Sequence, residues 1–149
     1  MTYKSIVSGL IISSVIIIIF SLSLQDAPTS NALSTNITQN LILLTQPIVD
    51  STSLTLSSIN SIVRDLGHFT LFFMLGFITL LAFVYQGLTF KQSVWTTLIL
   101  GIVIAIIDEC IQLTSVGRAF ELVDLGKDLL GLCTSIVLLF ILVIWNRNT

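Results

Sequence analysis

The stretch that decides the fold is residues 108–128, DECIQLTSVGRAFELVDLGKD. It contains five of the chain's eight acidic residues and two of its six basic residues. The flanking segments, residues 94–107 and 129–145, are almost entirely apolar. Charged groups at the edge of an apolar span are costly, so they usually face a protein interior or a wet cavity and usually have a function. The pattern therefore predicts a polar site between two membrane spans.

The composition is that of an integral membrane protein. Of 149 residues, 54% are hydrophobic and only 9% are charged, whereas soluble domains have about 25% charged residues. This length predicts a single domain over residues 1–149. No basic patch indicates nucleic-acid binding. Cys110 and Cys133 are expected to be buried thiols, and their spacing does not fit a zinc or redox motif.

Four apolar runs are long enough to cross a bilayer, which takes about 20 helical residues. They cover residues 6–24, 66–85, 94–113 and 122–145. The fold class is therefore all-α, a four-helix integral membrane bundle. The first run resembles a cleaved signal peptide in its basic start, but it is long and lacks an Ala-x-Ala site, so a retained helix is expected.

A segment rich in Ser, Thr and Asn, residues 25–62, separates the first two spans. Its apolar residues recur at spacings of three and four, which predicts short amphipathic helices broken near Pro47. This extracytoplasmic segment is expected to lie on the membrane surface or to fold over the bundle, and partial insertion into the bilayer stays open.

Orientation depends on the basic residues of the short loops. One side has Lys4, Lys91 and Arg147, and the other has Arg64, Arg118 and Lys127. The numbers tie, but only the second set has acidic residues close by in the sequence. The first set should therefore be cytoplasmic. Both termini are then inside, and the polar motifs face outward.

Helical spacing groups the polar residues near three helix ends. The i,i+4 pairs, which share a helix face, are Arg64 with His68, Asp108 with Gln112, and Asp124 with Asp128. Because successive spans alternate in direction, these ends lie at one membrane level and can converge on an outward-facing cavity. Glu121 and Lys127 are expected to be solvated loop charges.

The structural alternative is an ion-pair network without a further function. The adjacent carboxylates of Asp108 and Glu109 are costly near a membrane unless they are paired or protonated. Arg64 and Arg118 are the available cationic partners. Spacing favours a functional polar site, and a purely structural network stays open.

The order of the motifs resembles the VanZ-like family of small bacterial membrane proteins. The motifs are Ser23-Leu24-Gln25, Arg64-x-x-Gly67-His68-Phe69 with Leu75-Gly76, Asp108-Glu109-x-x-Gln112, Gly117-Arg118, and Asp124-x-x-x-Asp128-x-x-Gly131. The resemblance covers nearly the whole chain, with mild departures at Leu24 and Lys127. It implies a bacterial cell-membrane location and a role in the cell envelope. The namesake is associated with resistance to the antibiotic teicoplanin, but the resemblance implies no particular reaction.

Two classes of function fit these residues. The first is an enzyme or lipid-handling protein that acts on an envelope lipid, a cell-wall precursor or a glycopeptide-related ligand. His68 is then the acid or base, and Asp108 and Glu109 complete the catalytic set. The expected ligand-binding residues are Ser23, Gln25, Arg64, Gln112, Arg118, Asp124 and Asp128. The arginines suit a phosphate or carboxylate, and Asp108, Glu109, Asp124 and Asp128 are candidate ligands for a divalent cation.

The second class is a non-catalytic binding or shielding module, or one that contacts a partner protein. The charged network would then hold the bundle together, and the segment between the first two spans would make the contact. A transporter is disfavoured, because no charge lies near the middle of a span and no pair of broken helices is visible.

Overall fold

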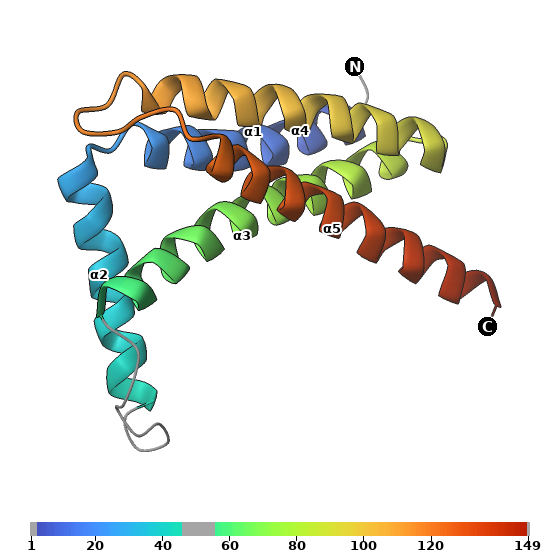
Figure 1. Cartoon of the computed structure of the whole chain (residues 1–149). Coiled ribbons are helices and arrows are strands. Elements are labelled where there is room, and N and C mark those ends of the chain that lie inside the picture. The colour runs from blue at the N-terminus through green and yellow to red at the C-terminus, as the bar shows by residue number, and fades with distance from the viewer. Residues whose placement is uncertain (1–2, 46–55, 149) are drawn as a thin grey trace.

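The computed structural model describes residues 3–45 and 56–148, which form five helices (Figure 1). The helices are α1 (Tyr3–Ser23), α2 (Ala27–Thr45), α3 (Leu56–Tyr85), α4 (Phe90–Gln112) and α5 (Leu122–Asn148). Four of them, α1, α3, α4 and α5, are long and apolar enough to cross a membrane. The predicted all-α fold with four spanning helices is confirmed.

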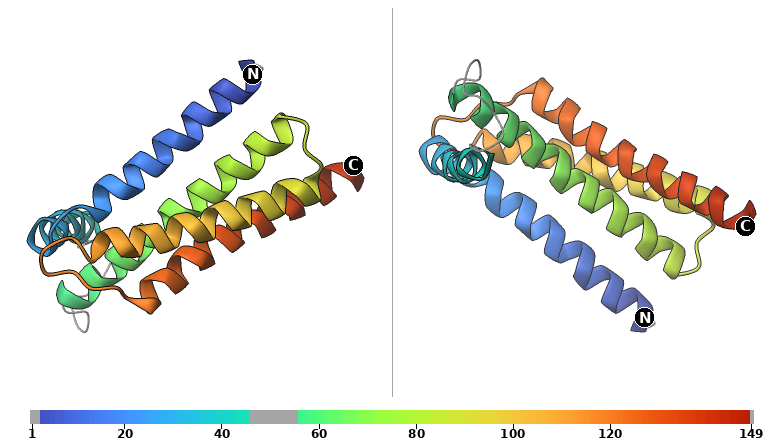
Figure 2. Two further views of the ribbon diagram at one scale, coloured as in Figure 1. Left: turned by 90° about the horizontal axis from the view of Figure 1, so that it is seen from above. Right: turned by 90° about the horizontal axis from the view of Figure 1, so that it is seen from below.

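The four long helices form one bundle, in which α3 packs against each of the other three and crosses α5 (Figures 1 and 2). Both ends of the chain lie at the same end of the bundle. At the opposite end, α2 lies across the bundle and packs against α3. This arrangement brings the end of α1, the early part of α3, the end of α4 and the start of α5 to one level.

The described part of the segment between the first two spans is helical, as predicted, and only the start of the next helix differs. Residues 27–45 form one continuous helix, and Pro28 lies in its first turn, where a missing N–H is tolerated. Pro47, where a break was predicted, lies outside the described residues. Helix α3 begins at Leu56, ten residues before the predicted start at 66. Its 30 residues extend about 45 Å, which is longer than the roughly 30 Å thickness of the hydrocarbon core.

Helix α4 has a complete capping box at its start. The backbone N–H of Gln92 donates to the Thr89 hydroxyl at 3.3 Å, and the Thr89 N–H donates to Gln92 Oε1 at 3.1 Å. Both groups belong to the first turn of a helix, where backbone donors have no helical partner. The short α3–α4 connection is therefore fixed by local hydrogen bonds at the end of the bundle opposite α2.

Close contact between α3 and α5 depends on Gly131. A Cβ atom at this position would lie 2.2 Å from the backbone oxygen of Phe69 and 3.0 Å from the backbone nitrogen of Phe73. Small residues allow helix backbones to approach closely in membranes, where association depends on packing. The absence of a side chain at Gly131 is therefore what allows α5 to lie directly on the backbone of α3.

The distribution of buried and exposed side chains is that expected of a protein surrounded by lipid. Large apolar side chains such as Ile99 and Leu130 are exposed on the spanning helices, while many buried side chains are polar or charged. Cys110 and Cys133 are exposed, so the prediction of buried thiols was wrong. In a bilayer an apolar thiol gains little by facing protein rather than hydrocarbon, and hydropathy alone cannot assign its face.

Candidate functional site

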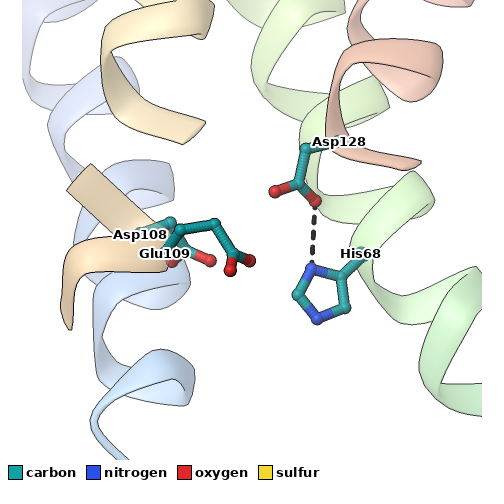
Figure 3. A group of neighbouring side chains, drawn as sticks. All are labelled: His68, Asp108, Glu109 and Asp128. Atoms are coloured by element: carbon teal, nitrogen blue, oxygen red, sulfur yellow. Dashed lines mark hydrogen bonds and ion pairs between the residues drawn. The ribbon is translucent and has the colours of Figure 1, made fainter. Parts of the chain in front are cut away.

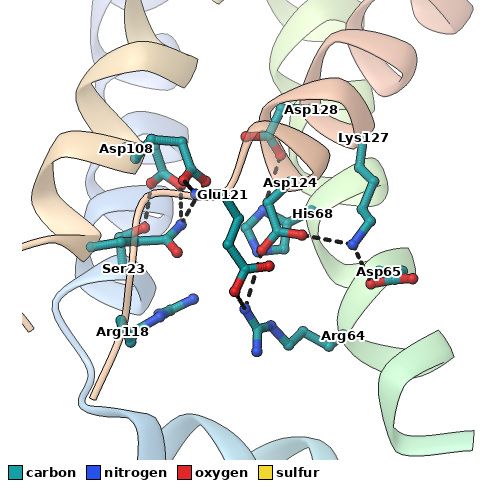
Figure 4. Close-up of polar contacts among 12 residues, drawn as sticks. Ser23, Arg64, Asp65, His68, Asp108, Arg118, Glu121, Asp124, Lys127 and Asp128 are labelled. Atoms are coloured by element: carbon teal, nitrogen blue, oxygen red, sulfur yellow. Dashed lines mark hydrogen bonds and ion pairs between the residues drawn. The ribbon is translucent and has the colours of Figure 1, made fainter. Parts of the chain in front are cut away.

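Four helix ends contribute polar side chains to one cluster (Figure 4). Ser23 comes from the last turn of α1, the Arg64–His68 turn from α3, the Asp108–Gln112 turn from α4, and the Asp124–Asp128 turn from α5. The predicted convergence of the last three helix ends is present in the structure. The α1 contribution was expected only from the family resemblance.

Asp108 and Glu109 are buried and are held by neutral donors. Asp108 accepts hydrogen bonds from the Ser23 hydroxyl and from Gln112 Nε2, the latter at 3.0 Å. Glu109 accepts from the same Gln112 amide at 3.2 Å and from the backbone N–H of Glu121 at 2.9 Å. One amide group thus donates to both adjacent carboxylates. Gln112 can do this because it lies one helical turn after Asp108.

His68 and Asp128 form a pair between α3 and α5. His68 Nδ1 lies 3.0 Å from Asp128 Oδ1 (Figure 3). His68 Nε2 lies 3.7 Å from Asp124 Oδ2. Asp128 is fully buried, and its second carboxylate oxygen has no hydrogen-bond partner among the described residues. The imidazole is therefore oriented by Asp128, with Asp124 at its other nitrogen.

The positively charged side chains of Arg64 and Lys127 neutralise Asp124. Arg64 Nη2 lies 3.1 Å from Asp124 Oδ2, and Lys127 Nζ lies 2.6 Å from Asp124 Oδ1. Lys127 also contacts Asp65 at 2.5 Å, which joins α5 to α3 a second time. A buried carboxylate needs such partners because desolvation of its charge is costly.

The structure assigns the partners of Arg64 and corrects the prediction for Lys127. Arg64 and Arg118 were the available cationic partners for Asp108 and Glu109, but the ion pairs of Arg64 are with Asp124 and, at 4.0 Å, with Glu121. Lys127 was expected to be a solvated loop charge, but it is only partly exposed and contacts two carboxylates. Its i,i+3 spacing from Asp124 was the signal in the sequence that indicated this role.

The loop between α4 and α5 brings a second arginine to the cluster. Gly117 has a positive φ of 77°, a conformation that glycine adopts without strain, and the chain then turns to present Arg118. Its Nη1 donates to the backbone oxygen of Leu22 at 3.4 Å. Partial burial lowers the pKa of Arg118, and the positive charge of Arg64 acts in the same direction. The two guanidinium groups thus lie near each other.

An open pocket borders this cluster, with a cavity volume of about 130 Å³. Its polar lining includes Ser23, Gln25, Arg64, His68, Asp108 and Arg118. Its apolar lining includes Ile19, Leu33, Ile37, Leu71 and Phe72. Other residues of the predicted ligand-binding set, Gln112, Asp124 and Asp128, lie behind the pocket in the buried network.

Four side chains have the composition of a metal site. Each of His68, Asp108, Glu109 and Asp128 offers a ligand atom, and these atoms all lie within 4.8 Å of one another. Asp124, a predicted cation ligand, is instead paired with Arg64 and Lys127. The structure thus groups the histidine, rather than Asp124, with the other three carboxylates.

Comparison with known proteins identifies the family. No curated protein and no solved structure matches the chain significantly. The family model described as VanZ/LLP1 matches residues 9–143, which include the whole polar cluster, three of the four candidate spans and most of the first. The chain is therefore a membrane protein of the VanZ/LLP1 family.

Proposed function

We propose that the protein binds an anionic amphiphile of the bacterial cell envelope, such as a lipid-linked phosphate, and that His68 serves as acid or base on its headgroup. The observation that carries this proposal is the mixed lining of the pocket. The lining combines apolar side chains with two arginines and a histidine. A lipid with a charged headgroup has the same division between apolar and anionic parts.

The apolar part of the pocket lining is accessible to a ligand. Leu33 and Ile37 of α2 line the pocket while 46% and 44% exposed, and the side chains that α2 buries are the small polar Ser34 and Thr38. Exposed apolar surface marks a binding groove or a membrane contact. An acyl or isoprenoid chain beside α2 would remove this surface from water.

The polar side suits a phosphate or carboxylate. Arg64 and Arg118 can each donate two parallel hydrogen bonds, the arrangement that recognises such groups. With a proton on Nδ1 donated to Asp128, His68 keeps a lone pair on Nε2 for proton transfer. Hydrolysis or transfer of a lipid-linked phosphate is the reaction class that this set favours. Asp108 and Glu109 would then adjust the charge beside the headgroup.

We place both termini in the cytoplasm, so that the pocket faces outward. This proposal depends on the basic residues at the termini end of the bundle, where Lys4 and Lys91 have no acidic neighbours in sequence. A phosphatase fused after the carboxyl end should then be inactive, and a cytoplasmic fluorescent reporter fused there should be active. The opposite pattern would place the polar site inside the cell.

The binding proposal is tested with a fluorescent isoprenoid phosphate and the uncharged alcohol of the same chain length. The full chain in lipid nanodiscs should prefer the phosphate. Arg118→Gln should weaken phosphate binding by about tenfold to one hundredfold, since a hydrogen bond to a charged group contributes about 1.5–3 kcal/mol. Lys91→Gln removes the same charge from the opposite end of α4 and is the matched control.

Equal affinity for the phosphate and the alcohol would refute the proposed headgroup recognition. An equal loss in both variants would mean that charge at a distance, rather than the pocket, attracts the ligand. The teicoplanin link implied by the family resemblance is tested separately, by susceptibility of a sensitive host that produces the protein. Protection that survives His68→Gln at unchanged membrane abundance would exclude acid–base chemistry from that role.

The alternative is a non-catalytic module whose charged network is structural. It is favoured by the inter-helix partners of the carboxylates: Asp108 joins α4 to α1, and Asp124 and Asp128 join α5 to α3. Under this alternative, alanine at these positions should lower membrane abundance and any protection together. Lost protection at normal abundance would instead support a binding or catalytic site.

A further inference from the structure

The centre of the polar cluster has three buried carboxylates whose hydrogen bonds come largely from neutral donors. Asp108 is 2% exposed, and Glu109 and Asp128 are fully buried. Ser23, Gln112 and the backbone of Glu121 donate to the first two, while Arg64 and Lys127 are engaged by Asp124. Uncompensated charge at such depth is costly, so the group requires protons or a bound cation.

A second observation concerns the free oxygen of Asp128. Its Oδ1 contacts His68, but its buried Oδ2 has no hydrogen-bond partner among the described residues. In Figure 3 this oxygen projects to the side on which Asp108 and Glu109 lie. Buried acceptors are nearly always satisfied in native proteins. An unsatisfied carboxylate oxygen that points into a group of carboxylates favours an electropositive ligand at that position.

The separations fit a single ion. The ligand atoms of His68, Asp108, Glu109 and Asp128 all lie within 4.8 Å of one another. Two ligands on opposite sides of an ion, each about 2.1 Å away, are about 4.2 Å apart, so small side-chain movements suffice. The four ligands come from α3, α4 and α5, and a bound ion would therefore connect three spanning helices.

We propose that His68, Asp108, Glu109 and Asp128 bind one divalent transition-metal cation, such as Mn²⁺ or Zn²⁺. Carboxylate oxygens suit hard ions, but an imidazole ligand favours a transition metal over Mg²⁺ or Ca²⁺. A dipositive ion balances most of the charge of three carboxylates. The site does not depend on the lipid binding proposed above, because its ligands are positioned by the helix bundle itself. While His68 ligates the ion, its lone pair is not available for proton transfer, so the acid–base role proposed above belongs to the metal-free protein.

The cation would also affect the neighbouring pocket. His68 and Asp108 belong both to the pocket lining and to the ligand set. A positive ion there would border the pocket that Arg64 and Arg118 also line and would add to their attraction for an anionic headgroup. Metal occupancy and headgroup affinity should therefore be coupled, although each can be measured alone.

The test uses the full chain, purified in detergent without added lipid through a tag that contains no histidine. After treatment with a chelator, Mn²⁺ binding is measured by electron paramagnetic resonance and Zn²⁺ binding by equilibrium dialysis, with Mg²⁺ in parallel. We expect one Mn²⁺ or Zn²⁺ per chain and weaker binding of Mg²⁺. His68 is the chain's single histidine, so bound Mn²⁺ should show electron spin echo modulation from one imidazole nitrogen.

Asp128→Asn should weaken Mn²⁺ binding at least about tenfold, since even outer residues around metal sites contribute that much. Glu121→Gln is the matched control: its side chain is 51% exposed and lies outside the ligand set. Lack of saturable binding by the folded wild-type chain would overturn the proposal. Equal Mn²⁺ affinities of the two variants would also overturn the proposal. Bound Mn²⁺ without imidazole modulation would overturn it as well, and this measurement on the wild-type chain is informative even if Asp128→Asn does not fold.

Discussion

Gly131→Ala should separate α3 from α5 at the level of the polar site. The new Cβ would lie 2.2 Å from the Phe69 oxygen, whereas real Cβ contacts are essentially never shorter than 3.0 Å. The helices must therefore move apart locally by about 0.8 Å, the difference between these distances. Asp128 lies one turn before Gly131, and His68 precedes Phe69. The 3.0 Å contact between His68 and Asp128 would lengthen beyond the range of a hydrogen bond, which ends at about 3.2 Å.

The expected loss of stability follows from two opposing terms. Overpacking against a rigid backbone costs about 3 kcal/mol, at the upper end of its usual range. Replacing a helical glycine by alanine gains about 1 kcal/mol. The free energy of unfolding should therefore fall by about 2 kcal/mol. A titration with sodium dodecyl sulfate, followed by circular dichroism in mixed micelles, measures this change.

Gly126→Ala is the matched control. It lies on the same helix, and a Cβ there meets nothing within 4 Å. Only the gain in helix propensity applies, so this variant should be as stable as the wild type or slightly more stable. Equal stabilities of Gly131→Ala and Gly126→Ala would refute the reasoning, because they would show that α3 and α5 do not approach as closely as the structure has them.

Three further changes test other parts of the structure. Asp124→Asn leaves Arg64 and Lys127 without their shared carboxylate and should lower the free energy of unfolding by about 3 kcal/mol. This is the low end of the range for a buried ion pair, because both cations are partly exposed. In the same detergent titration, Glu121→Gln should lower the free energy of unfolding only slightly. Thr89→Ala removes the capping box of α4 and should cost about 1 kcal/mol, whereas Thr89→Ser should retain most of it. Hydrogen bonds from the Thr29 side chain and, secondarily, from the Thr29 N–H at the start of α2 lower the pKa of Asp26 below its usual value of 3.8. The stabilisation of α2 by Asp26 should therefore be complete when the pH is above the usual pKa of an aspartate, and it should be lost as the pH falls through the lowered pKa of Asp26. Hydrogen exchange in the first turn of α2 should show this loss, and Asp26→Asn should abolish the pH dependence.

The four spanning helices could be predicted because their signals are local. Hydropathy and length identify a span, and the period of the helix places Asp124 and Asp128, or Asp108 and Gln112, on one face. The extent of α2 and the early start of α3 could not be predicted in the same way. A Ser- and Thr-rich sequence has weak helix signals, and these helices are stabilised partly by packing of α2 against α3.

The partners of the charges were harder to predict than their convergence. Whether Arg64 meets Asp124 or Asp108 depends on how each helix is rotated about its axis, and charge spacing within one helix does not determine that rotation. Lys127 lies at an i,i+3 spacing from Asp124, but the sequence does not reveal that Asp65 of another helix completes its environment. The exposed Cys110 illustrates the same limit, since lipid and protein interior are both apolar.

The distribution of partners among the helices has a consequence for membrane insertion. Arg64 and His68 enter the membrane with α3, but their carboxylate partners belong to α5, the last helix of the described chain. In a chain whose synthesis stops before α5, Arg64, His68 and the carboxylates of α4 would lack the contacts that α5 provides. Each charge that is then exposed to lipid costs several kcal/mol. Docking of the last helix is thus the step that completes the charge pairing. Truncated chains should be conspicuous substrates for membrane proteases.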